Sequence, residues 1–218
     1  MMRWIYIANI AVVFVILALI PPSDGPSRAG IAKRIALEAQ VPNSVSGILL
    51  RNRLYDTAFE VLVFTLAVLG VQYAFSFQRA EDEIFSLGDP TMVILCRIGA
   101  MVSALVFLEL GLRGHLAPGG GFAAGVAGGT AVGLVTLTGN AKELYLFYRH
   151  WHLASFEKAI VLVILLGVLV LFLLPGGTTS APALGSASVQ VLNMLVALKV
   201  AIGSWTIVLL FIRHRGLL

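Results

Sequence analysis

Lys199 is the first candidate for chemistry, because it lies in the middle of a long apolar stretch near the C-terminus. A charged group inside a bilayer is costly, so it usually faces protein or water and often marks an ion path. From the midplane its stem would have to span around 15 Å to reach water, half of a core about 30 Å thick. We therefore expect Lys199 to pair with a carboxylate or to lose its charge, and either state suits a proton relay. A purely structural ion pair is the alternative.

Four further ionisable residues lie within apolar stretches. Asp56 and Glu60 are four residues apart and would share one helix face; Arg97 and Glu109 lie in the next stretch. Buried carboxylates can bind Na⁺ or H⁺ in competition, which is the minimum requirement for exchange. Each residue also has a structural explanation. The acidic pair could be hydrated at an interface, Arg97 could extend to its own side of the membrane, and Glu109 could pair with Arg113.

Glycines recur every four residues at Gly121, Gly125, Gly129 and Gly133. This spacing puts them on one helix face and is typical of a helix that another helix approaches closely. The partner helix could belong to this chain or to another. We therefore interpret these four residues as packing positions.

Other chemistries have weak support in the sequence. A G-x-G-x-x-A run begins at Gly119, but a dinucleotide site needs a preceding β-strand, and an apolar span precedes this one. His150 and His152 lie in a connector without a third ligand, which is a weak metal signal. Cys96 stands alone in a span and is expected to be a small core residue. We expect no metal, no cofactor and no catalytic residue.

The composition requires a membrane protein. Of 218 residues, 59% are hydrophobic and only 12% are charged, whereas a soluble domain carries roughly 25% charged residues. A soluble enzyme, a disordered chain and, with one cysteine, a disulfide scaffold are excluded, and no clustered basic face indicates nucleic-acid binding. We predict an all-α integral membrane protein with about six transmembrane helices, since six windows reach the length of about 20 apolar residues: 3–21, 54–77, 91–112, 121–139, 157–174 and 189–212.

The connectors indicate how the spans are arranged. Residues 27–40 are predicted to form a short amphipathic helix at the membrane surface, and residues 140–156 read as a basic, aromatic connector. The apolar run of the first window is longer than the apolar region of a usual signal peptide and lacks a clean cleavage site, so it is expected to remain as a span. The uncharged loop 175–188 and the basic C-terminus favour a multi-pass protein of the cell membrane with both termini in the cytoplasm.

One stretch goes beyond composition. Residues 113–122 read RGHLAPGGGF, which resembles the GHxxPGGGF signature of the B subunit of Mrp-type multisubunit Na⁺/H⁺ antiporters and of the matching subunit of membrane-bound hydrogenases. The family often has Asn where this chain has Leu116, which removes a polar group from the turn. The resemblance implies that a turn is shaped by His115, Pro118, Gly119, Gly120 and Gly121. His115 is also kept as a candidate for the ion path.

A second stretch, residues 45–70, looks like the R-x-x-D-T-x-x-E segment at the C-terminal end of the antiporter A subunit. The match consists of Arg53, Asp56, Thr57 and Glu60. The resemblance implies a fusion of an A-tail or E-type segment, residues 1–80, with a B-type domain of four spans, residues 85–218. Asp56 and Glu60 would then be the acidic pair of the small segment.

The resemblances imply a subunit, not itself an enzyme, of a large complex that exchanges Na⁺ for protons. Its partners would be the other subunits, the two ions and the lipid bilayer. Two alternatives stay open: the same module in a redox-driven complex such as a membrane-bound hydrogenase or a complex I relative, and a purely structural packing subunit. A stand-alone transporter is less favoured, because no inverted repeat is evident.

Overall fold

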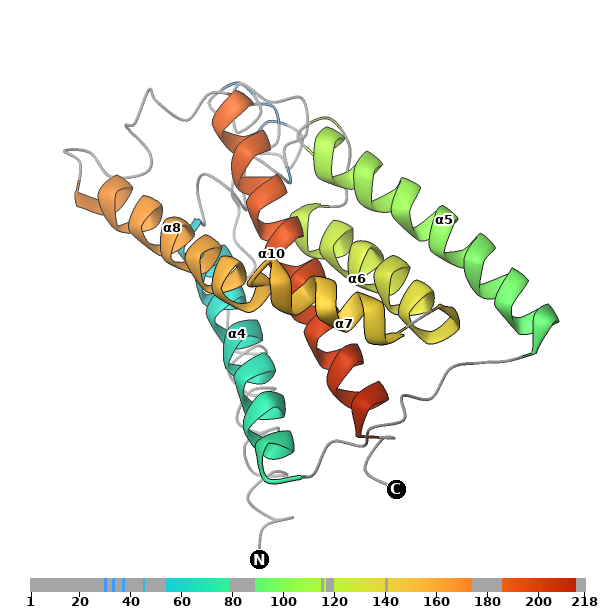
Figure 1. Ribbon diagram of the computed structural model, residues 1–218. Helices are drawn as coiled ribbons and strands as arrows, with labels where there is room; N and C mark the ends of the chain where they lie inside the picture. Colours follow the sequence, from blue (N-terminus) through green and yellow to red (C-terminus); the bar gives the residue numbers. More distant parts are fainter. Residues whose placement is uncertain are drawn as a thin grey trace, which may run out of the picture. The chain divides into compact units, whose positions relative to one another are not determined.

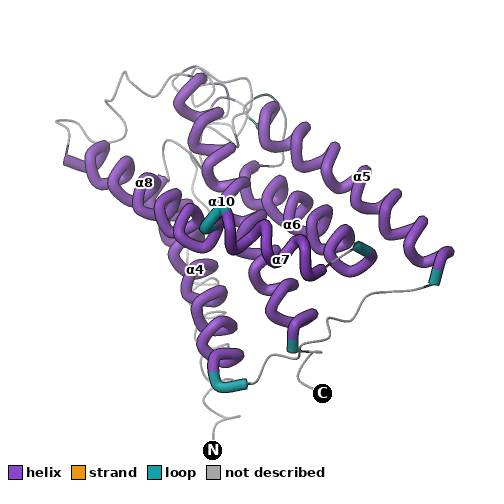
Figure 2. The backbone as a smooth tube through the Cα atoms, viewed as in Figure 1, coloured by secondary structure: helices purple, strands orange, loops and turns teal. Residues whose placement is uncertain are grey.

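The structure is a computed structural model. It describes residues 54–78, 89–114, 116, 120–139, 141–173 and 186–214, together with the single residues 30, 33, 37 and 45. The chain divides into two compact units, residues 1–32 and 33–218, and the elements below all belong to the second. Every element in the described part is a helix (Figures 1 and 2): α4 Leu54–Ser76, α5 Pro90–Arg113, α6 Gly120–Thr138, α7 Ala141–His150, α8 Leu153–Leu173 and α10 Ser186–Arg213.

Five of these helices, α4, α5, α6, α8 and α10, are long and apolar enough to cross a membrane. The all-α membrane fold predicted from composition is therefore confirmed, and the five predicted spans from residue 54 onward each coincide with one of them. The first predicted window, residues 3–21, lies outside the described residues. Of the predicted surface helix 27–40, the structure describes Gly30, Lys33 and Leu37, which are helical and exposed.

The predicted connector 140–156 is wrong in one respect, because it contains the ten-residue helix α7 and the beginning of α8. Helix α7 carries Glu143 in its first turn and Arg149 and His150 in its last turn, a distribution that favours a helix. The chain then bends at His152, whose φ of 48° lies in the left-handed region. Helix α8 starts directly after this bend, four residues before the predicted window.

The N-terminus of α5 shows why this span begins where it does. The Asp89 side chain accepts a hydrogen bond from the backbone N–H of Met92 at 3.1 Å. Pro90 occupies the first helical position, where its missing N–H costs nothing. Helix α6 begins at Gly120, whose φ of 73° is a conformation that glycine adopts without strain.

Helix α10 is the central element, since it contacts α4, α5, α6 and α8 (Figure 1). One side packs on the glycine face of α6. A Cβ atom at Gly121 would lie 2.5 Å from the carbonyl oxygen of Asn193, and one at Gly125 would lie 2.7 Å from that of Ala197. These glycines therefore let two helices of this chain approach until their backbones touch. At Gly133 the spacing relaxes, because an added Cβ would meet Val208 at 3.5 Å.

Helix α10 also forms the apolar core with α4 and α8. The buried residues of this core are Val61, Ile160, Val161, Ile164, Val196, Val200 and Ile202. Helix α5, in contrast, packs mainly on α6 and leaves large apolar side chains exposed, among them Ile98, Met101 and Leu105. This exposed face suits contact with lipid or with neighbouring subunits.

Candidate ion-path site

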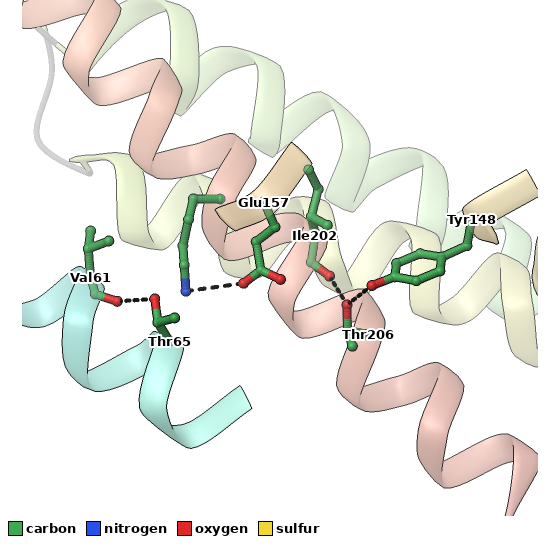
Figure 3. Close-up of polar contacts among 7 residues, drawn as sticks. Val61, Thr65, Tyr148, Glu157, Ile202 and Thr206 are labelled. Atoms are coloured by element: carbon green, nitrogen blue, oxygen red, sulfur yellow. Dashed lines mark hydrogen bonds and ion pairs between the residues drawn. The ribbon is translucent and has the colours of Figure 1, made fainter. Parts of the chain in front are cut away.

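A buried ion pair lies in the core between α8 and α10. The Nζ of Lys199 is 3.3 Å from Oε1 of Glu157, and the two side chains are 0% and 4% exposed. The dashed line to Glu157 in Figure 3 marks this contact. Lys199 comes from the middle of α10 and Glu157 from the second turn of α8. Glu157 is therefore the carboxylate partner of Lys199, whose side chain is shielded from water.

The surroundings of the pair are apolar. The Phe64 ring of α4 lies over the ammonium group, with Nζ 4.1 Å from the ring centroid, which is within the range of a cation–π contact. Gly203 makes room for the carboxylate, because a Cβ there would lie 3.0 Å from Oε1 of Glu157. Within the described part of the chain neither Nζ nor Oε1 has a hydrogen-bond partner. Charge attraction therefore joins a pair that the surrounding side chains shield from bulk water.

Two hydroxyl groups lie beside this pair, toward the C-terminal end of α10. The hydroxyl groups of Tyr148 on α7 and Thr206 on α10 are 2.8 Å apart, and Thr206 also donates to the carbonyl of Ile202 at 2.9 Å (Figure 3). Burial raises the pKa of Tyr148, so its hydroxyl stays protonated near neutral pH. Further along, Arg213 donates to the hydroxyl of Tyr145 at 2.8 Å.

Asp56 and Glu60 lie on the first two turns of α4, as their spacing predicts. Asp56 is half-buried and Glu60 is exposed. Both line an open groove of about 840 Å³ whose other walls include Phe64 and Phe122. The rings of these two phenylalanines meet edge to face, with centroids 6.3 Å apart. Phe64 therefore borders the acidic groove and also covers the ammonium group of Lys199.

The structure places the remaining predicted residues elsewhere. Glu109 binds Arg113 at 2.8 Å, and both side chains are more than half exposed, which is the surface couple considered as the alternative. Arg97 is exposed and lies at the edge of an apolar cavity of about 700 Å³ between α5, α6, α7 and α10. His115, Pro118 and Gly119 lie outside the described residues. The structure therefore brings Lys199 close to the groove of Asp56 and Glu60, and it separates Glu109 from this region.

Sequence reasoning missed Glu157 and Asn193. Glu157 was the first residue of a predicted window and was read as its boundary. Asn193 is fully buried in α10, and its amide nitrogen donates to the carbonyls of Leu110 at 3.0 Å and Gly111 at 2.8 Å. These carbonyls belong to the last turn of α5, which has no intrahelical donors for them. A single asparagine within an apolar stretch was the signal available for this contact.

Asn193→Ala is expected to destabilise the protein by about 1–3 kcal/mol, because it leaves two carbonyl groups of α5 without donors. The measurement is thermal unfolding of the purified protein in detergent. Gln190→Ala is the matched control, since Gln190 donates one exposed hydrogen bond to Leu112 at 3.1 Å on the same helix end. Equal effects of the two substitutions would show that the buried position of Asn193 confers no special stability.

Comparisons with known proteins extend this picture. Residues 91–206, more than half of the chain, match the family described as a domain related to the MnhB subunit of Na⁺/H⁺ antiporters. A solved chain of the membrane-bound sulfane sulfur reductase, an archaeal respiratory membrane complex, has a similar fold, with a TM-score of 0.67 and 21% sequence identity. The likeness covers 97% of this chain and 98% of that chain. No curated protein matches the sequence.

Proposed function

The chain belongs to the family of domains related to the MnhB subunit of Na⁺/H⁺ antiporters, and we propose that it is a membrane subunit of a multisubunit Na⁺/H⁺ antiporter complex. In this role the Lys199–Glu157 pair holds an exchangeable proton inside the membrane. The observation that carries the proposal is the burial of both charged side chains at the centre of an apolar bundle. Such a pair is costly to maintain, and intramembrane ionisable groups usually mark an ion path.

Residues 1–80 are proposed to be the A-tail or E-type segment, and residues 85–218 the B-type domain. The acidic groove supports this division, because Asp56 and Glu60 lie on α4 and open toward Phe122 of α6. Two carboxylates at this position suit the binding of Na⁺ or H⁺ from the groove. Both termini are proposed to lie in the cytoplasm.

A redox-driven complex is the second candidate. The fold likeness to a chain of the archaeal respiratory complex favours it, and the likeness extends over both proposed parts of this chain. In that setting the energy would come from electron transfer in subunits other than this one. The local proton chemistry of Lys199 and Glu157 would be the same.

Affinity purification of the tagged chain in mild detergent, followed by mass spectrometry, separates the candidates. Large antiporter-type subunits are expected to copurify. Copurified iron–sulfur subunits would instead establish the redox-driven complex. A chain that purifies alone, from membranes that show normal cation/proton exchange, would overturn its assignment as a subunit.

The proton-holding role is tested in vesicles that contain the complete complex. The double substitution Lys199→Met with Glu157→Gln removes both charges and leaves no isolated buried charge. It is expected to abolish Na⁺-driven proton movement while the complex still assembles. Normal proton movement in this variant would make the chain a structural packing subunit.

A further inference from the structure

We infer that the hydroxyl pair of Tyr148 and Thr206 connects the buried Lys199–Glu157 pair with the exposed, charged side of α7. This inference rests on the proposed function, because it assigns the next step of a proton held by that pair. It makes Tyr148 and Thr206 relay residues rather than packing residues.

The spacing along α10 brings the carboxylate and the hydroxyl pair together. Oε1 of Glu157 lies against Gly203, where an added Cβ would be 3.0 Å away. Thr206 is three residues further along the same helix, and residues with this spacing are neighbours on one face, about 5–6 Å apart at their Cβ atoms. Figure 3 shows Glu157 followed by the contact between Thr206 and Tyr148. In the relay, one water molecule between the Thr206 hydroxyl and the Glu157 carboxylate bridges this gap.

The hydrogen-bond directions define how a proton would move inward. Thr206 donates to the carbonyl of Ile202, so in this arrangement Tyr148 donates to Thr206. The O–H bond of Tyr148 breaks as a new O–H bond forms on Thr206. The original proton of Thr206 turns from Ile202 to the bridging water, and the water delivers a proton to the carboxylate of Glu157. Tyr148 regains a proton from water at α7, so one proton moves and nothing is oxidised or reduced.

The two sides of the ion pair differ in their ability to pass a proton. On the α4 side the ring of Phe64 covers Nζ, and a phenyl ring has no exchangeable proton. On the α7 side the described residues offer two hydroxyl groups in contact with each other. Burial raises the pKa of the Tyr148 phenol, so the hydroxyl remains a donor and does not become a trapped anion. The pair can therefore exchange protons toward α7 while Phe64 keeps it apart from the groove of Asp56 and Glu60.

Tyr148→Phe and Thr206→Val test the relay, because each removes a hydroxyl group and keeps the size of the side chain. Tyr148→Phe also keeps the edge-to-face contact with Trp205, whose ring centroid is 5.4 Å away. In vesicles with the complete complex, each variant is expected to slow Na⁺-driven proton movement about ten- to a hundredfold, on the scale of a lost proton-transfer group. The solvent deuterium isotope effect on the rate is expected to increase, which a loosened structure alone would not cause.

Tyr145→Phe is the matched control, since it removes a hydroxyl from the same helix that contacts Arg213 and not the pair. It is expected to leave the rate within about twofold of the wild type. If Tyr148→Phe and Thr206→Val keep the wild-type rate and isotope effect while the double variant of Lys199 and Glu157 is inactive, the relay is overturned and the proposed function stands. If the double variant is also fully active, both fail together.

Discussion

Lys199→Met alone is expected to destabilise the protein by about 3–5 kcal/mol, the cost of leaving one member of a buried ion pair without its partner. The carboxylate of Glu157 is 4% exposed and in contact with Gly203 and the core, so it has no access to bulk water. Glu157→Gln is expected to have a similar cost, because it isolates the ammonium group. The double variant is expected to recover most of the loss, since no lone charge remains.

The measurement is a double-mutant cycle on thermal unfolding of the purified complex in detergent, in which neighbouring residues reveal their coupling as non-additivity. Arg113→Met and Glu109→Gln form the matched control cycle. That pair has a shorter contact of 2.8 Å, but its side chains are 60% and 57% exposed. Exposed pairs contribute about 0–1 kcal/mol. Additive effects at Lys199 and Glu157 would contradict the burial of the pair.

The spanning helices were predictable because length and hydropathy alone decide them. A run of about 20 apolar residues has few alternatives to a membrane helix. Helix α7 was not predictable in this way, because it has only ten residues, charged side chains lie near both of its ends and its mean hydropathy is low. The charges at its ends, Glu143 and Arg149, match the helix dipole and are the signal in the sequence that indicates this helix.

The site was half predictable. The position of Lys199 within an apolar stretch predicted either a carboxylate partner or loss of the charge, because a lone buried charge is costly. The identity of the partner did not follow, because Glu157 and Lys199 are far apart in sequence and only the crossing of α8 and α10 brings them together. The start of α8 at Leu153 also moves Glu157 one turn into the helix, away from the boundary where the sequence placed it.

The glycine spacing predicted a close-packing face on α6, but it did not predict which helix packs on that face. The same four-residue repeat serves contacts within a chain and between chains. The structure places Gly121, Gly125 and Gly129 against α10, and Gly128 against Phe107 of α5. The contact with α10 matters for the site, because the segment of α10 that packs on Gly125 includes Val200, the residue next to Lys199.

Gly125→Ala is consequently expected to destabilise the protein by about 3 kcal/mol, near the upper end of the usual cost of overpacking. The new Cβ would lie 2.7 Å from the carbonyl oxygen of Ala197 and even closer to the Cβ of Val200. Both are fixed parts of α10, so the two helices have to separate to admit one methyl group. The same shift would displace Lys199 from Glu157, and proton movement is expected to fall together with the unfolding temperature.

Gly133→Ala and Gly70→Ala are the controls for this effect. An added Cβ at Gly133 is in ordinary contact with Val208 at 3.5 Å, and at Gly70 nothing lies within 4 Å. Alanine is favoured over glycine inside a helix by about 0.5–1 kcal/mol, so both substitutions are expected to be neutral or slightly stabilising in the same unfolding measurement. If Gly125→Ala behaved like Gly133→Ala, the two helices would not be in backbone contact at Gly125. The close packing of α6 on α10 would then not be what positions the ion pair.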